Sequence, residues 1–567
     1  MSIKEKKEKE VNKWIGVILS IAIPVLVLTA VYLKDGLLFE SNDDFFIARL
    51  LSGALTGAPT IHALHVRVWI TAPLCFLYRM NAQLPWWGLF LLGMFVLSHA
   101  VILYYGMKNK PERLFIVPVA ELAITFSYLT MVGRIQYTSI AILTAVAGYA
   151  CLILEREKKS AGIWFFVLEF LSFGLRDNAM LLIQPFGLLV LIGIGSAEKE
   201  KVKTGFLKTV IAVVFIIALG LLGRAVTGEF TEEWKNIYTF HNMRMEAYDY
   251  GQIPSYGDVK EVLTEYGVSE EEWETFADYY LQEWSMNPEL NKALKSEIRN
   301  IRKTPSVTEL LKELYDGTVA DPKAWPVVLM FLFAVGFMVL SMKFRYTRAL
   351  IGFLIAHFID WGYIFYRGRV MDRVAIPLLT AECLFLLFII LSMVEIGKVF
   401  EKKKILKIFV IYAALAGLVV LSFFRGRDRH REMADDKMTQ KILAESFREI
   451  ENYCNERPNE AFILDINSLT SVQGGVLDAG PNLPVNYKYN GGWFSVMPEY
   501  KQGMREYLGK ENGFSYIVYD FGDAWDRMEC GTAKNFKRIC GSEPVLKDRI
   551  RVSSGGEFLV YRFDYQD

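Results

Sequence analysis

The residues best suited to chemistry begin with two adjacent carboxylates, Asp43 and Asp44, in the sequence ESNDDFFIARLLSG. The pair follows the first long apolar segment and precedes an apolar stretch that begins at Phe45. Such a stretch would hold both carboxylates at headgroup depth, where they could accept a proton or bind a divalent cation. The structural alternative is that Asn42 or Asp43 caps a helix beginning at Phe45.

Three arginines, Arg367, Arg369 and Arg373, lie in the sequence YRGRVMDR between two late apolar segments. A guanidinium group presents a fork of donors that matches phosphate oxygens, so a phosphate-carrying lipid is a natural partner. Contact with anionic headgroups, or with acidic residues of the loop 224–324, would explain the same arginines without a substrate.

Charged residues also occupy other short connections between apolar segments. Arg176 and Asp177 lie in FGLRDN, where they form either a simple ion pair or part of the same polar site. Arg134 lies in GRIQY. Because polar groups at span ends that face one cavity usually mark a functional site, these three residues form a second candidate cluster.

The loop 224–324 contains the sequence FHNMRMEAYDYG, which offers four polar side chains as substrate contacts. They are His241, Asn242, Arg244 and Asp249. A helix resting on the membrane surface is the alternative interpretation of this segment.

The elements that must position these residues are apolar blocks of about 20 residues, the length of a helix that crosses a bilayer. The chain has 567 residues, of which 53% are hydrophobic, and a mean hydropathy of +0.24. This composition indicates an α-helical polytopic membrane protein with about eleven transmembrane helices. The predicted spans are 14–33, 86–106, 114–132, 135–154, 161–175, 179–195, 206–223, 325–342, 347–365, 374–396 and 405–424.

The apolar block 61–80 is long enough to span but carries two histidines and two arginines. If it does not cross, the N-terminus and the basic clusters at 108–113, 156–159, 199–208, 343–348 and 398–407 fall on the cytoplasmic side, as the positive-inside rule requires, and Arg367–Arg373 lies outside. We therefore expect 61–80 to form an interfacial helix in the first outer loop, 34–85. The loop 224–324 and the segment 425–567 would also lie outside.

Residues 1–424 are thus predicted to form the membrane domain, and residues 425–567 an extracytoplasmic α/β domain. In the latter we expect an amphipathic helix over 437–453 and strands over 461–466, 514–520 and 557–563. The domain contains no GxGxxG, P-loop or GxSxG motif. It therefore offers no phosphate-binding or nucleophile motif of its own.

Composition and cysteine spacing exclude some classes of function. The formal net charge is zero, so the chain shows no bias toward nucleic acid. The six cysteines include no CxxC pair, which argues against a zinc or redox site. Cys530 and Cys540 lie close in sequence in the outer domain, and we expect them to form a disulfide that leaves Cys454 unpaired.

These features resemble the membrane glycosyltransferases of the type-C fold, a group that includes protein O-mannosyltransferases and lipid A aminoarabinose transferases. Asn42-Asp43-Asp44 stands where those families carry an acidic pair, although theirs is usually Asp-Glu. RVWITAPLCFLYRM (67–80) stands where they carry an interfacial helix. YRGRVMDRVAIPL (366–378) looks like their arginine-bearing entry into a late span. The resemblance covers roughly residues 10–425.

The resemblance implies a plasma-membrane enzyme that takes a sugar from a polyprenyl-phosphate donor and passes it to an acceptor outside the cytoplasm. Asp43 or Asp44 would deprotonate the acceptor hydroxyl, and the arginines at 367, 369 and 373 would hold the departing phosphate. The N-terminus would be cytoplasmic. Membrane lipids would be further partners, the acceptor and sugar are unspecified, and a divalent cation is left open as a cofactor.

Two other classes of function stay open. A lipid or polysaccharide transporter, or a polymerase of another architecture, would commonly show two similar halves, and the sequence shows none. A membrane-anchored binding protein would carry its activity in 425–567, and the acid pair would be incidental. Only the enzyme hypothesis predicts that alanine at Asp43 and Asp44 removes activity from a folded protein.

Overall fold

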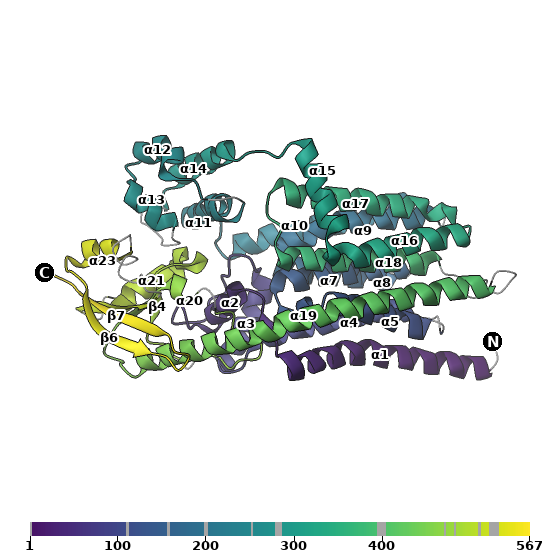
Figure 1. Ribbon diagram of the computed structural model, residues 1–567, viewed down its shortest axis with the longest axis horizontal. Helices are drawn as coiled ribbons and strands as arrows, with labels where there is room; N and C mark the ends of the chain where they lie inside the picture. Colours follow the sequence, from purple (N-terminus) through teal and green to yellow (C-terminus); the bar gives the residue numbers. More distant parts are fainter. Residues whose placement is uncertain are drawn as a thin grey trace.

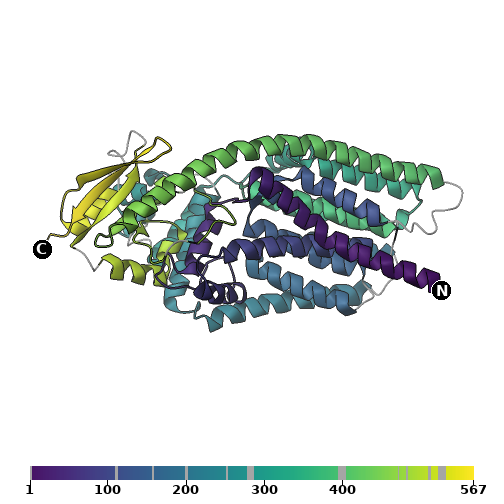
Figure 2. The same cartoon turned by 90° about the horizontal axis from the view of Figure 1, so that it is seen from below.

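A computed structural model gives the structure of residues 3–108, 111, 113–155, 159–197, 202–250, 253–277, 286–393, 404–469, 472–480, 483–508, 512–520 and 532–566. Long helices run side by side in a bundle, with the N-terminus at one end and the C-terminal domain at the other (Figure 1). The view from below shows α1 (Ile3–Asp35) and the long helix α19 (Lys404–Asn455) on the outside of this bundle (Figure 2).

Eight helices in the described part of the chain are long and apolar enough to cross a membrane, as expected of a multi-pass membrane protein. They are α1, α4 (Trp86–Met107), α7 (Tyr137–Leu154), α9 (Asp177–Ala197), α10 (Val202–Val226), α16 (Trp325–Leu340), α17 (Thr347–Tyr366) and α18 (Asp372–Met393). The other three predicted spans coincide with α5 (Arg113–Ser127), α8 (Lys159–Leu175) and the first part of α19, which are not among the eight.

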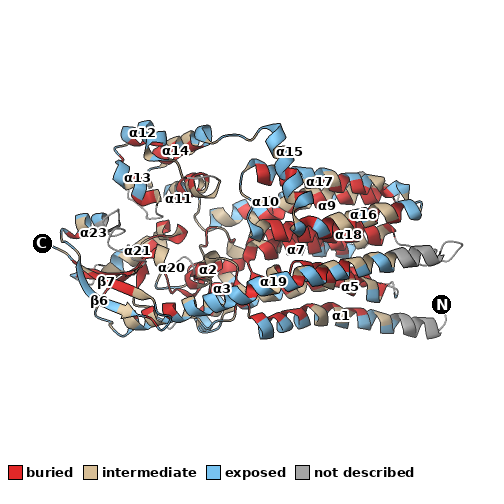
Figure 3. Cartoon of the chain, viewed as in Figure 1, coloured by how far each residue is buried: buried red, intermediate tan, exposed pale blue. Residues whose placement is uncertain are grey.

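The helices differ in how deeply they lie in the bundle. Nearly all side chains of α7 and α18 are buried, so these two helices form its centre (Figure 3). By contrast, α10 exposes apolar side chains such as Ile211, Phe215 and Leu222. Because helices that are apolar all round are buried in protein or in lipid, we assign the exposed face of α10 to the lipid.

Segment 61–80 contains one short helix, α3 (Val68–Met80), of 13 residues. At about 1.5 Å per residue this helix is roughly 20 Å long, which is shorter than the hydrocarbon core of about 30 Å. It lies beside α2 (Asn42–Ser52) at the end of the bundle away from the N-terminus (Figure 1). Its position on an outer leaflet stays a prediction.

The loop 224–324 folds into short helices that lie over the same end of the bundle (Figure 1). They are α11 (Glu232–Arg244), the π-helix η1 (Met245–Asp249), α12 (Tyr256–Glu265), α13 (Glu270–Ala277), α14 (Pro288–Ile301) and α15 (Val307–Tyr315). The loop is therefore mostly helical, and it places α11 and η1 above the ends of the long helices.

The C-terminal domain contains a five-stranded sheet of order β4-β3-β5-β7-β6. Its strands are β3 (Phe462–Leu464), β4 (Lys488–Tyr489), β5 (Gly513–Tyr519), β6 (Val545–Arg551) and β7 (Glu557–Asp564). Strands β4, β3 and β5 run parallel to one another. Strand β7 pairs antiparallel with β5, and β6 pairs antiparallel with β7. The three predicted strands are present, and the α/β character of the domain follows from them.

Helix α19 connects the membrane bundle to this sheet without a break. It spans 52 residues and contains both the predicted span 405–424 and the predicted amphipathic helix 437–453. The expected boundary between residues 424 and 425 therefore falls inside one helix. Of the two expected disulfide partners, Cys540 is buried, and Cys530 lies outside the described residues.

The C-terminal domain packs directly on α2. The ring of Phe46 lies 4.7 Å from that of Phe494, and Arg49 Nη2 lies 2.8 Å from Glu451 Oε1 on α19. Because Phe46 and Arg49 are both buried, this contact fixes the position of α2 and of the residues that begin it.

A second contact between the membrane helices and the C-terminal domain depends on a glycine. A Cβ atom added at Gly88 in α4 would lie 1.8 Å from the carbonyl oxygen of Val476. We expect Gly88→Ala to destabilise the purified protein by about 1–3 kcal/mol, because the segment around Val476 must move away. The matched control is Gly93→Ala in the same helix, where a Cβ would meet nothing within 4 Å. Equal melting temperatures for the two variants would contradict the prediction.

Candidate functional site

Helix α2 begins earlier than the capping hypothesis requires. Its first residue is Asn42, after an extended Ser41 whose side chain makes no capping hydrogen bond. Asp43 and Asp44 therefore lie in the first helical turn, where the helix dipole favours carboxylates. The expected helix start at Phe45 is wrong, since the three polar residues before it are themselves helical.

The two aspartates point into different surroundings. Asp43 lines a cavity of about 840 Å³, and Arg373 Nη1 donates to its Oδ2 at 3.5 Å. Asp44 is fully buried and accepts a hydrogen bond from Trp87 Nε1 at 3.1 Å. Burial, and then the adjacent Asp43 charge, raise the pKa of Asp44 well above its usual range. Of the two aspartates, Asp43 is therefore the one that faces the cavity, and Asp44 is enclosed beside Trp87.

The cavity lies where α2, the starts of α7 and α9, the α11–η1 segment, the α17–α18 connection and the C-terminal domain meet. Its polar lining residues are Asn42, Asp43, His65, Gln136, Tyr137, Thr138, Arg176, Asn178, His241, Arg244, Asp249, Tyr250, Asp360, Tyr363, Arg367, Arg369, Arg373, Asn467 and Trp493. Segments far apart in sequence thus build one site.

Two of the predicted phosphate-binding arginines are already paired with acids of the loop 224–324. Arg369 Nη1 lies 2.7 Å from Asp249 Oδ2. Arg367 Nη2 lies 3.2 Å from Glu246 Oε1, and its guanidinium lies 3.7 Å from the centre of the Tyr250 ring. Arg367 and Arg369 therefore make the contacts with acidic residues of that loop that were the alternative to phosphate binding.

Glu246 is the centre of an arginine cluster that ties this loop to the end of α17. Besides Arg367, it accepts from Arg299 at 2.6 Å and from Arg302 at 2.9 Å, although its side chain is only 3% exposed. Burial alone would raise the pKa of Glu246, but these hydrogen bonds outweigh it and lower the pKa. The cluster therefore holds η1 in place above the cavity.

Two other arginines of the cavity have no such partner. Within the residues that the structure describes, no carboxylate oxygen lies within 4 Å of Arg176 or Arg244. Arg176 Nη1 donates to the hydroxyl of Tyr137 at 3.3 Å, and Arg244 lies over Tyr248 at 5.9 Å. Both arginines are half-buried. Because a partly enclosed charge is favoured by an opposite charge nearby, two guanidinium groups that face one cavity without a carboxylate partner favour an anionic ligand.

Two histidines line the cavity beside these arginines. The rings of His65 and His241 lie 4.9 Å apart; His241 is buried and His65 is half-buried. Burial lowers the pKa of both, and the charges of Arg176 and Arg244 lower it further, so both are well below their usual range. The histidines are therefore neutral donors or acceptors and add no positive charge.

Four cavity residues each have a buried polar atom without a hydrogen-bond partner in the described structure. These atoms are Arg244 Nε, Asp360 Oδ2, Arg367 Nε and Trp493 Nε1. Since more than about 90% of buried polar groups in proteins are paired, four such atoms around one cavity point to groups that a ligand supplies. Asp360 could have been identified from the sequence, because an ionisable residue inside an apolar span usually has a function. Nothing in the sequence around Trp493 marks it as a site residue.

The other two members of the second candidate cluster lie elsewhere. Arg134 pairs with Asp436 of α19 and lines a separate cavity of about 140 Å³. Asp177 pairs with Arg67, at the start of α3. Of this cluster, only Arg176 reaches the main cavity, because the other two side chains turn toward partners on neighbouring helices.

Asp43 and Asp44 do not bind one metal ion together, because the side chain of Asp43 faces the cavity and that of Asp44 faces Trp87. In the described ranges of the chain, no group of three or more histidine, cysteine or acidic side chains is placed to hold a metal ion.

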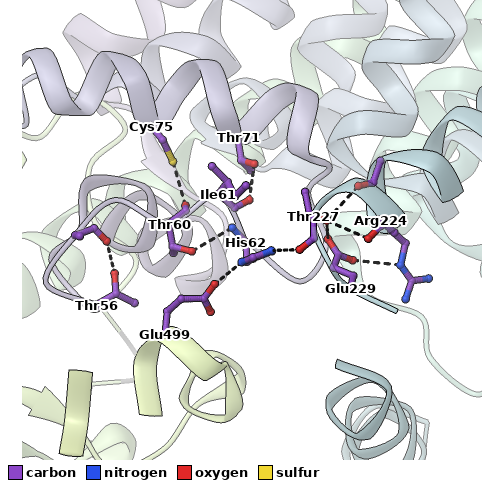
Figure 4. A network of polar contacts seen from close by, with 12 residues as sticks. Thr56, Thr60, Ile61, His62, Thr71, Cys75, Arg224, Thr227, Glu229 and Glu499 are labelled. Carbon is purple, nitrogen blue, oxygen red and sulfur yellow. Dashed lines mark hydrogen bonds and ion pairs between the residues drawn. The ribbon is translucent and has the colours of Figure 1, made fainter. Parts of the chain in front are cut away.

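One histidine outside the cavity joins three segments of the protein (Figure 4). The Nδ1 atom of His62 contacts the carboxylate of Glu499 in α21 (Pro498–Leu508), and its Nε2 lies 3.2 Å from the carbonyl oxygen of Thr227 after α10. The ring also lies 4.8 Å from that of Trp234 in α11. Because both nitrogen partners are acceptors, a protonated His62 satisfies both.

This contact should make the docking of the C-terminal domain depend on pH. Burial opposes both shifts, but the mutual hydrogen bond raises the pKa of His62 above 6.5 and lowers that of Glu499 below 4.5. The stabilisation is therefore complete between pH 4.5 and 6.5 and is lost as the pH rises through the folded pKa of His62. We expect His62→Gln to lower the melting temperature most near pH about 6 and least near pH about 9. A difference that stays constant with pH would contradict this.

Comparison of the chain with protein-family models, curated proteins and solved structures finds no match.

Proposed function

We propose that the protein transfers a sugar from a polyprenyl-phosphate donor to a hydroxyl group of an acceptor, as its resemblance to type-C glycosyltransferases implies. The observation that carries the proposal is one cavity that brings Asp43 together with Arg176, Arg244 and Arg373. Such a transfer requires a carboxylate that accepts the proton of the acceptor hydroxyl and guanidinium groups that neutralise the leaving phosphate.

The donor phosphate is assigned to the arginines that are not tied up by strong ion pairs. Arg176 and Arg244 lack a carboxylate partner among the described residues, and Arg373 contacts Asp43 only at 3.5 Å. Arg367 and Arg369 shape the cavity through Glu246 and Asp249 instead. This assignment revises the expectation that the arginines at 367, 369 and 373 act as one phosphate site.

The lipid chain of such a donor needs a path into the membrane, and the cavity wall offers one. Leu181 of α9 and Ile359 and Tyr363 of α17 all line the cavity, yet their side chains are 40%, 50% and 57% exposed. Both helices are among the eight candidate spans. An isoprenoid chain that lies along these exposed side chains would stay in lipid while its phosphate enters the cavity.

In the proposed reaction, Asp43 accepts the proton of the acceptor hydroxyl as its oxygen bonds to the anomeric carbon of the sugar. The bond between that carbon and the phosphate oxygen breaks, and polyprenyl phosphate leaves with the electron pair. Arg176, Arg244 and Arg373 stabilise the negative charge that develops on the phosphate. The cavity would face the extracytoplasmic side of the plasma membrane, with the N-terminus in the cytoplasm, as the charge distribution predicts.

The test uses the full chain reconstituted in liposomes. Polyprenyl-phosphate donors with radiolabelled glucose, mannose, galactose or N-acetylglucosamine are supplied one at a time, each with a mixture of oligosaccharides, glycolipids and serine- or threonine-containing peptides that offers acceptor hydroxyl groups. We expect one of them to be consumed, with release of polyprenyl phosphate. Consumption of none, or movement of an intact donor across the bilayer as a transporter would produce, would contradict the proposal.

A further inference from the structure

The C-terminal domain forms one wall of the cavity. Its lining residues are Ile466, Asn467, Gly492 and Trp493. They follow strands β3 and β4, which are parallel, so their carboxyl ends lie at the same edge of the sheet. In open sheets with parallel strands, ligands commonly bind outside this edge.

Trp493 is the side chain of this wall best suited to hold a ligand. It is only 7% exposed, and its indole Nε1 is buried with no hydrogen-bond partner in the described residues. Gly492, just before it, has φ = 90°, and a Cβ there would lie 2.9 Å from Phe494. The backbone conformation at position 492 thus requires glycine, and this conformation sets the position of the Trp493 backbone.

The chemistry of this wall differs from that of the rest of the cavity. None of the four described lining residues that the C-terminal domain contributes is charged, whereas all five lining arginines come from the membrane helices, their connections or the loop 224–324. The ring of His65, a neutral histidine, lies 6.0 Å from Trp493. This side of the site is therefore polar and aromatic but carries no charge of its own.

The candidate base lies between the two walls. Helix α2 contacts the C-terminal domain through Phe46, whose ring lies 4.7 Å from Phe494, and contacts the arginine wall through Asp43 and Arg373. In a transfer reaction the acceptor hydroxyl must touch the base, and the leaving phosphate must lie on the other side of the sugar. The acceptor is thus placed on the side of the C-terminal domain.

We propose that the C-terminal domain provides the acceptor subsite and that its ligand is an uncharged, hydroxyl-rich carbohydrate that packs against the ring of Trp493 and accepts a hydrogen bond from its Nε1. This inference rests on the proposed function. The ring face suits the apolar C–H face of a sugar, and a sugar hydroxyl supplies the acceptor that the buried N–H lacks. A purely apolar ligand would leave Nε1 unpaired, and an anionic one would favour the arginine wall.

The test measures binding without any donor, by saturation-transfer NMR on the full chain in nanodiscs, with maltotriose, cellotriose and chitotriose as probes. We expect at least one probe to bind the wild-type protein. Trp493→Phe keeps a ring but loses the N–H, and should weaken binding by about 3- to 10-fold. Trp493→Ala should weaken it by about 30-fold or more. The control is Trp86→Phe, because Trp86 Nε1 already donates to the Asn81 carbonyl outside the cavity.

The outcomes separate this inference from the proposed function. If none of the probes binds, or if both Trp493 variants bind as the wild type does, the acceptor subsite is wrong even where a donor is consumed. If a probe binds through Trp493 but no donor is consumed, the carbohydrate subsite stands and the transferase proposal fails. Because Trp493→Phe changes little volume, it keeps the test decisive should the alanine variant fail to fold.

Discussion

Replacing Asp43 by asparagine is expected to lower the rate of sugar transfer by about 10²–10⁴-fold, the usual contribution of a positioned general base. The amide keeps the shape of the side chain but cannot accept the proton of the acceptor hydroxyl. Donor binding should change little, because Asp43 contributes only one contact at 3.5 Å to the arginine wall. The measurement is the initial rate of donor consumption at saturating donor, in liposomes that contain equal amounts of folded protein.

Asp44→Asn is the matched control for this substitution. Asp44 is buried away from the cavity, burial raises the pKa of its carboxyl well above the usual range, and its contact with Trp87 Nε1 can be kept by an amide oxygen. We therefore expect a rate within a few-fold of the wild type. If Asp44→Asn abolished transfer while Asp43→Asn did not, the assignment of the base would be reversed and the divergence of the two side chains would have no catalytic meaning.

Replacing Arg244 or Arg176 by glutamine is expected to lower the efficiency of donor use by about 10²–10³-fold for each residue, as for the loss of one preorganised donor at a developing charge. Both arginines face the cavity without a carboxylate partner in the described part of the chain, so their charge is available to the phosphate. Lysine at either position keeps the charge but loses the fork, and should recover part of the lost efficiency. The measurement is kcat/KM for the donor.

Arg134→Gln is the control for the arginine variants, because Arg134 pairs with Asp436 and lines a different cavity. It should leave donor kcat/KM within a few-fold of the wild type. Equal losses for Arg134→Gln and Arg244→Gln would indicate a general effect of removing positive charge near the membrane, rather than a phosphate site.

The membrane helices could be predicted from the sequence because length and hydropathy are local properties. All eight candidate spans coincide with predicted blocks, and the short helix α3 lies within the block expected not to cross. The continuity of α19 could not be predicted in this way, because its charged middle part, 425–436, separates the predicted span 405–424 from the predicted helix 437–453 and shows no apolar periodicity of its own. Strand β6 was missed because its sequence, VLKDRIR, is charged and largely exposed.

The candidate site was only partly accessible to sequence reasoning. Asp43 and Arg373 could be named from residue type and position, but the partners that occupy Arg367 and Arg369 come from a loop more than a hundred residues earlier in the sequence. Adjacent aspartates look equivalent in a sequence. Only the packing of α2 shows that Asp44 is turned toward Trp87 and Asp43 toward the cavity.

The central claim is that this cavity binds a polyprenyl-phosphate donor between Asp43 and the free arginines. The most direct test is an experimental structure of the full chain in nanodiscs with polyprenyl phosphate bound. The proposal predicts phosphate density within hydrogen-bond distance of Arg176, Arg244 or Arg373, with the isoprenoid chain lying against the exposed side chains of Leu181, Ile359 and Tyr363. Phosphate density in the smaller cavity beside Arg134, or a lipid that leaves the main cavity empty, would contradict it.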